Sequence, residues 1–161
     1  MSRVRSRGNK DTELALAKLL RRHGITGWRR QVNLTVSSRR PVLRSSTAEG
    51  GRKETHFPKQ DSVRVSSPRL LRVKPDFVFR QARLAVFVDG CFWHGCPKHA
   101  TKPANNKEFW KKKLAGNQTR DRLVTRTLRR AGWHVFRIWE CELTRMNETR
   151  LLQRLKSFLK R

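Results

Sequence analysis

Three cysteines and one histidine form the first group of residues whose types and spacing could do chemistry. Cys91, Cys96 and His99 lie close together in an irregular segment, and Cys141 follows a predicted strand much later in the chain. Three thiolates and one imidazole suit a tetrahedral zinc ion in a structural site, with all four positions filled. An odd number of cysteines argues against a disulfide framework. The alternative is that Cys91 and Cys96 are small buried residues and that His99 is incidental.

Acidic residues form the second group, because the chain has only 12 of them and several fall on apolar patterns. Glu13 and Asp121 precede apolar residues at helical spacing, so each would lie on the apolar face of a helix. Asp76 opens an apolar strand and Asp89 closes the next, so a hairpin of these strands would bring both carboxylates together near one end. Inward carboxylates in a basic protein would gather a divalent cation, and oxygen ligands beside phosphate favour Mg²⁺.

Each of three acids also has a simpler interpretation. The dipole at the start of the helix could stabilise Glu13, a neighbouring Lys or Arg could pair with Asp121 on the surface, and Asp89 could make a turn with Gly90. Taken together, and beside so much positive charge, the acids favour a metal-dependent nuclease.

The net charge limits the kind of partner. The chain carries 39 Lys+Arg against 12 Asp+Glu, a formal charge of +27, and its isoelectric point is about 11.8. A surface this basic favours a phosphate backbone. No apolar run approaches the roughly 20 residues of a membrane span, and no apolar stretch of a signal peptide follows the start. We therefore expect no membrane partner and, in a bacterium, a cytoplasmic, nucleoid-associated protein, although charge alone does not separate an enzyme from a histone-like one.

A regular succession of helices and strands must position these groups. Apolar periodicity predicts helices over residues 11–23, 107–131 (broken near Gly116-Asn117) and 147–160, and strands over 28–34, 76–79, 84–88 and 135–139. The strands over 76–79 and 84–88 should form a hairpin, and the second, apolar on both faces, should be buried. This order predicts a mixed α/β or α+β fold in a single domain, residues 1–161.

Two polar segments lie outside that succession. The basic arm, residues 1–10, carries Arg3, Arg5 and Arg7, and would either lie across a DNA groove or fray in solvent. Residues 35–72 form a Ser/Arg-rich insert, for which we expect a long polar loop. The insert would be either solvated or a second surface in contact with nucleic acid.

Residues 90–99 carry the most specific pattern in the chain. They read Gly-Cys-Phe-Trp-His-Gly-Cys-Pro-Lys-His, and Asn117-x2-Arg120-Asp121 and Ile138-Trp139-Glu140-Cys141 follow. The series resembles the very-short-patch repair endonucleases and related homing endonucleases of the restriction-endonuclease-like superfamily, in which Pro-Asp before an apolar strand, here Pro75-Asp76, recurs. The resemblance implies a restriction-endonuclease-like α/β fold, with a central mixed sheet flanked by helices and a structural zinc site.

The resemblance also implies roles for individual residues. Asp76 matches the family's metal-binding aspartate, His94 its catalytic histidine, and Asp121 the aspartate that orients this histidine. Glu13 matches an acid on the first helix, which would hold metal-bound water, and the Val88 main-chain carbonyl matches a further metal ligand. The structural zinc ligands of the family correspond to Cys91, Cys96, His99 and Cys141.

Aromatic residues in the same pattern concern the DNA. Phe92 and Trp93 match aromatics that wedge into the DNA stack beside a mispaired base. Without the resemblance, core packing would be an equal interpretation of both. We expect Trp110, Trp133 and Trp139 in the core.

The chain departs from the family pattern at Asp89 and in the insert. Asp89 stands where the family often has a histidine, and it could itself bind the metal. That would bring the site nearer the paired-acid form of the superfamily, although the superfamily's lysine two residues later is replaced by Cys91. Both departures bear on substrate specificity more than on chemistry.

The resulting hypothesis is a Mg²⁺-dependent endonuclease that nicks duplex DNA beside a T:G mismatch. His94 would act as general base toward water or as acid toward the leaving oxygen. Duplex DNA is the expected partner of a monomer, with mismatch-repair proteins as further candidates. The alternatives are a related homing-type or non-specific DNA nuclease, and a non-catalytic, zinc-containing nucleic-acid-binding module.

Overall fold

The computed structural model describes residues 10–37, 70–101 and 105–160. In chain order these form α1 (Lys10–Arg22), β1 (Trp28–Arg30), β2 (Leu34–Ser37), β3 (Leu70–Val73), β4 (Phe77–Phe79), β5 (Leu84–Asp89), α2 (Lys107–Arg130), β6 (His134–Trp139), the short 3-10 helices η1 (Glu140–Leu143) and η2 (Arg145–Asn147), and α3 (Glu148–Leu159). The three predicted helices are all present. No helix in these ranges is long and apolar enough to span a membrane.

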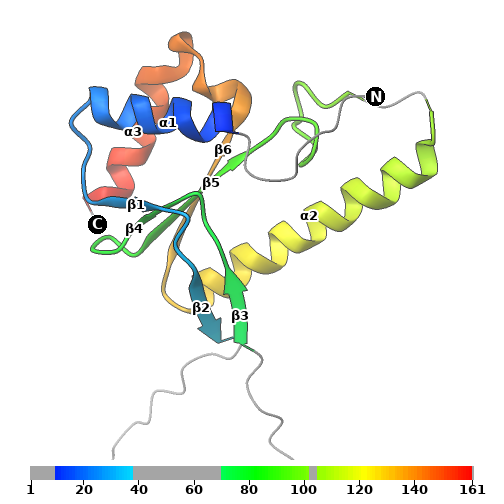
Figure 1. Cartoon of the computed structure of the whole chain (residues 1–161), viewed down its shortest axis with the longest axis horizontal. Helices are drawn as coiled ribbons and strands as arrows, with labels where there is room; N and C mark the ends of the chain where they lie inside the picture. Colours follow the sequence, from blue (N-terminus) through cyan, green and yellow to red (C-terminus); the bar gives the residue numbers. More distant parts are fainter. Residues whose placement is uncertain (1–9, 38–69, 102–104, 161) are drawn as a thin grey trace, which may run out of the picture.

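The central sheet is mixed, with the strand order β1-β4-β5-β6 (Figure 1). β4 and β5 form the predicted antiparallel hairpin, with Phe77 opposite Val86, and β1 adds antiparallel to β4. β6 pairs parallel with β5 after the α2 crossover. The expectation of an α/β fold built on a mixed sheet flanked by helices is confirmed.

Helices α1 and α3 cover one face of the sheet (Figure 1). Strand side chains alternate between faces, so every second residue of β4, β5 and β6 points to this core. Its buried residues are Leu16, Ala17, Leu19, Leu20, Ile25, Phe77, Phe79, Leu84, Val86, Phe136, Ile138, Leu151, Leu152 and Leu155. The helical spacing of the leucines in α1 and α3 therefore reflects their burial against the sheet.

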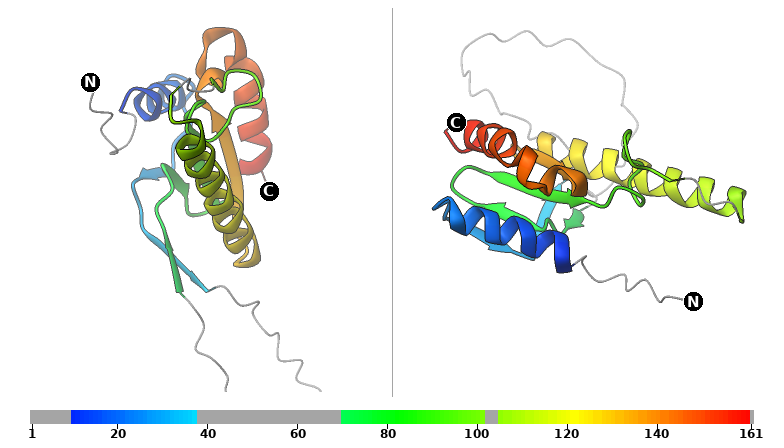
Figure 2. Two further views of the ribbon diagram at one scale, coloured as in Figure 1. Left: turned by 90° about the vertical axis from the view of Figure 1, so that its right-hand side faces the viewer. Right: turned by 90° about the horizontal axis from the view of Figure 1, so that it is seen from above.

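The opposite face packs against the C-terminal half of α2 and the two-stranded sheet β2–β3. Its buried residues are Leu34, Val36, Val73, Val78, Ala85, Leu128 and Val135. The N-terminal half of α2 extends beyond the strands, as Figure 1 and the right-hand view of Figure 2 show. Only one half of this helix is therefore fixed by the core, and the other is available for contacts elsewhere.

The segment predicted as one strand over residues 28–34 is two strands in different sheets. Gln31 adopts a φ of 58° between β1 and β2, which breaks the extended backbone. β2 pairs antiparallel with β3, from Leu34 opposite Val73 to Ser37 opposite Leu70. Both ends of the predicted insert 35–72 thus lie in paired strands rather than in a loop.

The rest of the insert and the predicted DNA-contacting arginines of the arm lie outside the described residues. These are residues 38–69 and Arg3, Arg5 and Arg7.

The predicted break in the helix at Gly116-Asn117 is wrong, because α2 is continuous over its 24 residues. One glycine inside a helix costs only about 1 kcal/mol relative to alanine. The side chain of Asn117 also has a tertiary partner, since its Nδ2 donates a hydrogen bond to the Trp93 carbonyl at 3.0 Å. The helix therefore continues through both residues and links to the loop after β5.

Candidate active site and metal centre

The loop after β5 carries most of the predicted site residues. Residues 90–100 form successive turns, one of which is closed by a hydrogen bond from the Cys96 N–H to the Cys91 carbonyl (2.9 Å). Gly95 has a φ of 70°, and a Cβ at this position would lie 2.5 Å from Nε2 of Gln118. The left-handed backbone in the turn between His94 and Cys96 therefore favours glycine, because another side chain there would be strained.

The four predicted zinc ligands meet in one place, which we call the Cys/His cluster: Cys91, Cys96, His99 and Cys141. Their ligand atoms all lie within 4.8 Å of one another. The sulfur of Cys96 is 3.8 Å from that of Cys141 and 3.9 Å from Nδ1 of His99. Cys141 lies on η1, directly after β6, so the cluster joins the loop after β5 to the end of the neighbouring parallel strand.

The chemistry of the Cys/His cluster fits a metal ion. Three unpaired thiols and an imidazole supply four donors, the number used by a tetrahedral structural site. Burial raises the pKa of Cys91. Burial acts in the same direction on Cys96, but hydrogen bonds from the backbone of Lys98 and from His99 outweigh it and lower the pKa of that thiol. A bound cation would favour the thiolate form at all three positions.

His94 and Asp121 pair across the space between the loop and α2. Nδ1 of His94 lies 2.5 Å from Oδ2 of Asp121, and both side chains are half-buried. This hydrogen bond raises the pKa of His94, although burial opposes it. Burial would raise the pKa of Asp121, but His94 and the charge of Arg137 outweigh that effect and lower it. Because Nδ1 is held by the carboxylate, Nε2 is the atom through which the ring can exchange a proton.

Arg137, in the middle of β6, is a site residue that the sequence analysis missed. Its Nε and Nη2 donate to Oδ2 and Oδ1 of Asp89, both at 2.6 Å, and Nη2 also lies 2.9 Å from Oδ1 of Asp121. The signal was present, since an arginine within the apolar run Val135-Phe136-Arg137-Ile138 needs an acidic partner once the strand is buried.

The same contacts bear on Asp89, whose expected role as a ligand of the catalytic metal stays a prediction. Both oxygens of its buried carboxylate accept hydrogen bonds from the Arg137 guanidinium. A bidentate pair of this kind fixes the carboxylate and uses about two of its roughly four lone-pair positions. Asp89 is therefore a partner of the arginine.

Asp76 lies directly before β4, beside the backbone of β5. Its Oδ2 accepts a hydrogen bond from the Val88 N–H at 2.7 Å. Burial raises the pKa of Asp76 to about 6, and the nearby carboxylates of Glu13 and Asp89 add to the rise. Within residues 10–37, 70–101 and 105–160, no Lys or Arg forms an ion pair with Asp76. A half-buried carboxylate without a cation fits a site for a divalent metal.

Glu13 is buried on the inner face of α1, as predicted, with 4% of its surface exposed. Its Oε2 accepts hydrogen bonds from Nη2 of Arg30 (2.6 Å) and Nε2 of Gln31 (3.0 Å). These donors come from β1 and from the bend that follows it, so the break in the strand at Gln31 positions the acid. Glu13 thus lies beside Asp76 with its charge partly compensated.

Four aromatic side chains gather above the loop, and we call them the aromatic cluster: Phe92, Trp93, Phe109 and Trp110. Ring centroids of Phe92 and Trp93 lie 5.1 Å apart, and the Trp110 ring lies 5.3 Å from Phe92, 5.9 Å from Trp93 and 5.3 Å from Phe109. Phe109 is 58% exposed and the other three are partly exposed. The prediction that Trp110 belongs to the core is therefore wrong, whereas Trp133 does pack against the second core.

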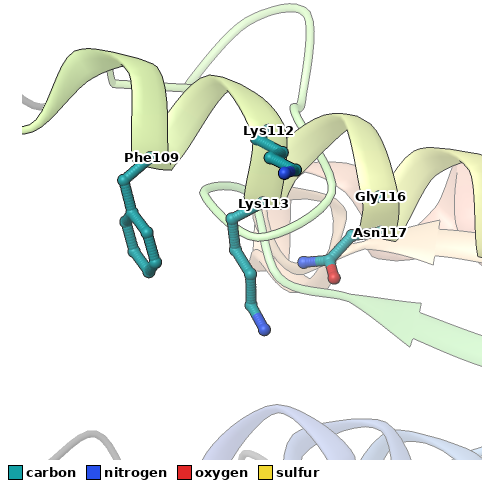
Figure 3. A pocket seen from close by; sticks show the side chains of 5 residues that line it. All are labelled: Phe109, Lys112, Lys113, Gly116 and Asn117. Atoms are coloured by element: carbon teal, nitrogen blue, oxygen red, sulfur yellow. The ribbon is translucent and has the colours of Figure 1, made fainter.

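An open pocket adjoins the aromatic cluster along the projecting half of α2 (Figure 3). Phe109, Lys113 and Asn117 follow one another at intervals of one helical turn, and Figure 3 shows their side chains on the same side of the helix. Lys112 and Gly116 complete its lining. An exposed aromatic ring beside two lysines suits a ligand that has both flat rings and phosphates.

Comparison with known proteins gives a consistent result. The family model of DNA mismatch endonuclease Vsr matches residues 62–100. The chain is 51% identical over 72 residues to the Type II nicking enzyme V.NaeI of Lentzea aerocolonigenes (45% of this chain and 43% of the relative). It is 37% identical over 90 residues to the DNA mismatch endonuclease Vsr of Escherichia coli K12 (53% and 58%). The chain thus spans about half the length of these two relatives.

A third relative is matched over most of its length. The chain is 34% identical over 119 residues to the Type II nicking enzyme V.NmeDIP of Neisseria meningitidis serogroup C, a match that covers 70% of this chain and 80% of the relative. Identity at this level over so large a share of both chains extends well beyond the motif around residues 90–99. Together with the mixed sheet and the gathered site residues, it shows that this chain belongs to the Vsr family of DNA mismatch endonucleases, within the restriction-endonuclease-like superfamily.

Proposed function

We propose that this chain is an endodeoxyribonuclease that hydrolyses one phosphodiester bond in duplex DNA, beside a T:G mismatch. The observation that carries the proposal is the pairing of His94 with Asp121, together with a half-buried Asp76 that has no Lys or Arg partner among the described residues. A proton-transfer group and a ligand for a hard cation are the two elements that metal-assisted phosphodiester hydrolysis needs.

Two different metal ions suit the two groups of donors. Asp76 and the main-chain carbonyl of Val88 would hold Mg²⁺, and Glu13, oriented by Arg30 and Gln31, would bind water beside it. When bound, this ion supplies positive charge that polarises the scissile phosphate. The Cys/His cluster would hold Zn²⁺ as a structural ion, because all four positions are filled by protein donors.

His94 moves the proton in this proposal. As the water oxygen bonds to phosphorus, the bond from phosphorus to the leaving oxygen breaks, and one proton must pass from the water to the leaving group. Nε2 of His94 either accepts the proton from water or gives one to the leaving oxygen. Asp121 holds Nδ1, which fixes the tautomer and the direction of the ring.

The aromatic cluster and the projecting half of α2 supply contacts to DNA. Phe92 and Trp93 are held side by side with Trp110, and such rings can stack between bases where a mismatch weakens the pairing. Lys112 and Lys113 adjoin them on α2 and suit the phosphate backbone (Figure 3). This arrangement supports recognition of a distorted duplex rather than of a small molecule.

A plasmid assay tests the enzymatic part of the proposal. Supercoiled DNA should be converted to the nicked form by the protein with Mg²⁺, but not in EDTA, and not by Asp76→Ala or His94→Ala. Binding of DNA without Mg²⁺-dependent nicking would refute the enzyme and support a zinc-containing binding module.

Matched synthetic duplexes test the substrate. We expect faster nicking of a duplex with one T:G pair than of the same sequence with T:A. Relatives carry the names of a mismatch endonuclease and of nicking enzymes, so the preference is a direct discriminator. Equal rates on both duplexes would indicate a homing-type or non-specific nuclease.

A further inference from the structure

A single guanidinium holds two of the site carboxylates in place. Arg137 makes a bidentate pair with Asp89 and a third contact with Asp121, and its Nη1 lies 3.5 Å from Oγ1 of Thr125 on α2. Its Cζ also lies 5.0 Å from the ring centroid of Phe87. The side chain is only 24% exposed, so these contacts account for most of its surroundings.

The sheet geometry explains why these groups meet. β5 and β6 are parallel, with Arg137 opposite Phe87, and Asp89 lies two residues further along β5. Residues two apart on a strand point to the same face, and α2 covers that face. The arginine therefore extends under α2 toward the end of β5, where Asp121 reaches down from the helix.

The arginine also separates two possible partners of His94. Nδ1 of His94 lies 2.5 Å from Oδ2 of Asp121, and the next carboxylate oxygen, Oδ1 of Asp89, is 3.8 Å away. Asp89 is buried, and without Arg137 its charge would be uncompensated next to an imidazole that can donate to it. With Arg137 present, both oxygens of Asp89 are occupied, and Asp121 uses Oδ1 for the arginine and Oδ2 for the histidine.

We propose that Arg137 is a positioning residue for the nicking reaction: it occupies Asp89 and orients Asp121, so that His94 is held by Asp121 alone. The inference rests on the proposed function, in which His94 transfers the proton. Arg137 acts through the carboxylates and not on the DNA, because its donors point at Asp89 and Asp121. Without Arg137, the imidazole of His94 can turn toward Asp89, and Nε2 then no longer points at the atom with which it exchanges a proton.

Nicking kinetics on the full chain with Mg²⁺ separate this role from that of a phosphate contact. Arg137→Met should lower kcat by about 100-fold, the order of loss expected from a misplaced catalytic group, with KM for DNA changed by less than about threefold. The kcat of Arg137→Lys should lie between those of the wild type and Arg137→Met, since an ammonium supplies positive charge without the planar pair of donors. The matched control is Arg129→Gln, which removes one exposed positive charge from the far end of α2 and should retain the wild-type kcat.

A double variant tests the mechanism of the loss. Asp89→Asn with Arg137→Met removes both the competing carboxylate and its partner, and it should recover most of the kcat lost in Arg137→Met alone. A raised KM with unchanged kcat in Arg137→Met would overturn the proposal in favour of a phosphate contact. Additive losses in the double variant would also overturn it.

The state of the His94 ring provides a readout that does not depend on nicking. Nitrogen NMR of labelled protein should show one Nδ1-protonated form for His94 in the wild type and in the double variant, and a mixture in Arg137→Met. If the wild type does not nick DNA, the proposed function fails, while this spectrum still decides the positioning role. An identical His94 spectrum in wild type and Arg137→Met would refute that role.

Discussion

Two clusters of polar residues, contributed by several elements, meet near the end of β5 and the loop that follows it, and they differ in how their charges are balanced. In the Cys/His cluster, four donors face one another within 4.8 Å and offer a closed set of ligands. In the acidic cluster of Glu13, Asp76, Asp89 and Asp121, three acids are paired with Arg30, Arg137 or His94, and Asp76 has no ion-pair partner among the described residues. The first arrangement suits stability and the second suits reaction.

This difference shows how one end of a sheet can serve two purposes. A closed donor set binds a metal tightly and joins two chain segments, as a structural site does. An open set keeps one carboxylate in an unfavourable environment, where burial raises the pKa of Asp76 to about 6. Groups perturbed in this way are common at reactive sites. Substitutions in the two clusters should therefore affect different properties.

The largest effect is expected from Cys141→Ser, which removes one of four donors from the Cys/His cluster. Binding energy of a structural metal is folding energy, so the variant should lose the bound metal and more than about 3 kcal/mol of stability. Elemental analysis and denaturant unfolding measure the two quantities. A variant that retained both would show that this cluster is an ordinary buried group of thiols.

The next effect is expected from Asp76→Asn, and it should appear in activity alone. Loss of the metal-ligating charge should lower the nicking rate by at least about 1,000-fold, which corresponds to about 4 kcal/mol. Stability should not fall, because the amide replaces a carboxylate whose burial is unfavourable. Thermal unfolding with and without EDTA checks the second expectation. A large loss of stability would show that Asp76, like the Cys/His cluster, serves stability, and the difference between the two clusters would then not hold.

Trp93→Ala should have an intermediate effect, on DNA binding. Stacking on a base contributes about 1–3 kcal/mol, so affinity for a T:G duplex should fall by about 5-fold or more. Trp133→Phe, in the second core, is the matched aromatic control and should bind DNA as the wild type does. Fluorescence anisotropy at fixed salt measures both. Equal affinity of Trp93→Ala and wild type would assign the aromatic cluster to packing.

The smallest effect is expected from Glu148→Gln, which lies outside both clusters. A hydrogen bond with His23 and the nearby charge of Arg22 lower the pKa of Glu148, and these contacts join α3 to the end of α1. A lowered folded-state pKa stabilises the protein above the unfolded value of 4.5, and this contribution is lost as the pH falls through the folded-state pKa. The melting temperature of the variant should be slightly lower than wild type at pH 7, with the difference closing as the pH falls below 4.5 and through the folded-state pKa.

Metal content and nicking should be unchanged in Glu148→Gln. A change in either would mean that the contact between α1 and α3 controls one of the clusters.

Much of the framework followed from local patterns. Apolar periodicity predicted all three helices and the hairpin of β4 and β5, because burial on a sheet imposes spacings of 3.6 and 2 residues. The three cysteines of the chain and a closely spaced histidine predicted the set Cys91, Cys96, His99 and Cys141, which the fold brings together. Monomeric state and mismatch-repair partners stay predictions.

What local patterns could not predict were contacts between distant segments. Gln31, where the strand breaks, donates a hydrogen bond to Glu13 on α1. Asn117, beside Gly116 in the continuous helix α2, donates one to the Trp93 carbonyl. Trp110 joined the aromatic cluster because the N-terminal half of α2 extends beyond the sheet (Figure 2). Helix and strand propensities depend on residues that are close along the chain, whereas these features depend on contacts between residues that are distant in sequence.

By itself, the sequence determined which chemical groups are available. These are an excess of Lys and Arg that favours phosphate, three cysteines with a histidine as metal donors, and a few acids on apolar faces. Only the tertiary structure decided which acids have a basic partner and which does not. Parallel pairing of β5 with β6 places Arg137 beside Asp89, which makes that aspartate a partner of the arginine and leaves Asp76 without one among the described residues. The physical reason is that a buried charge takes its role from the nearest opposite charge, and that neighbour is set by strand register rather than by sequence distance.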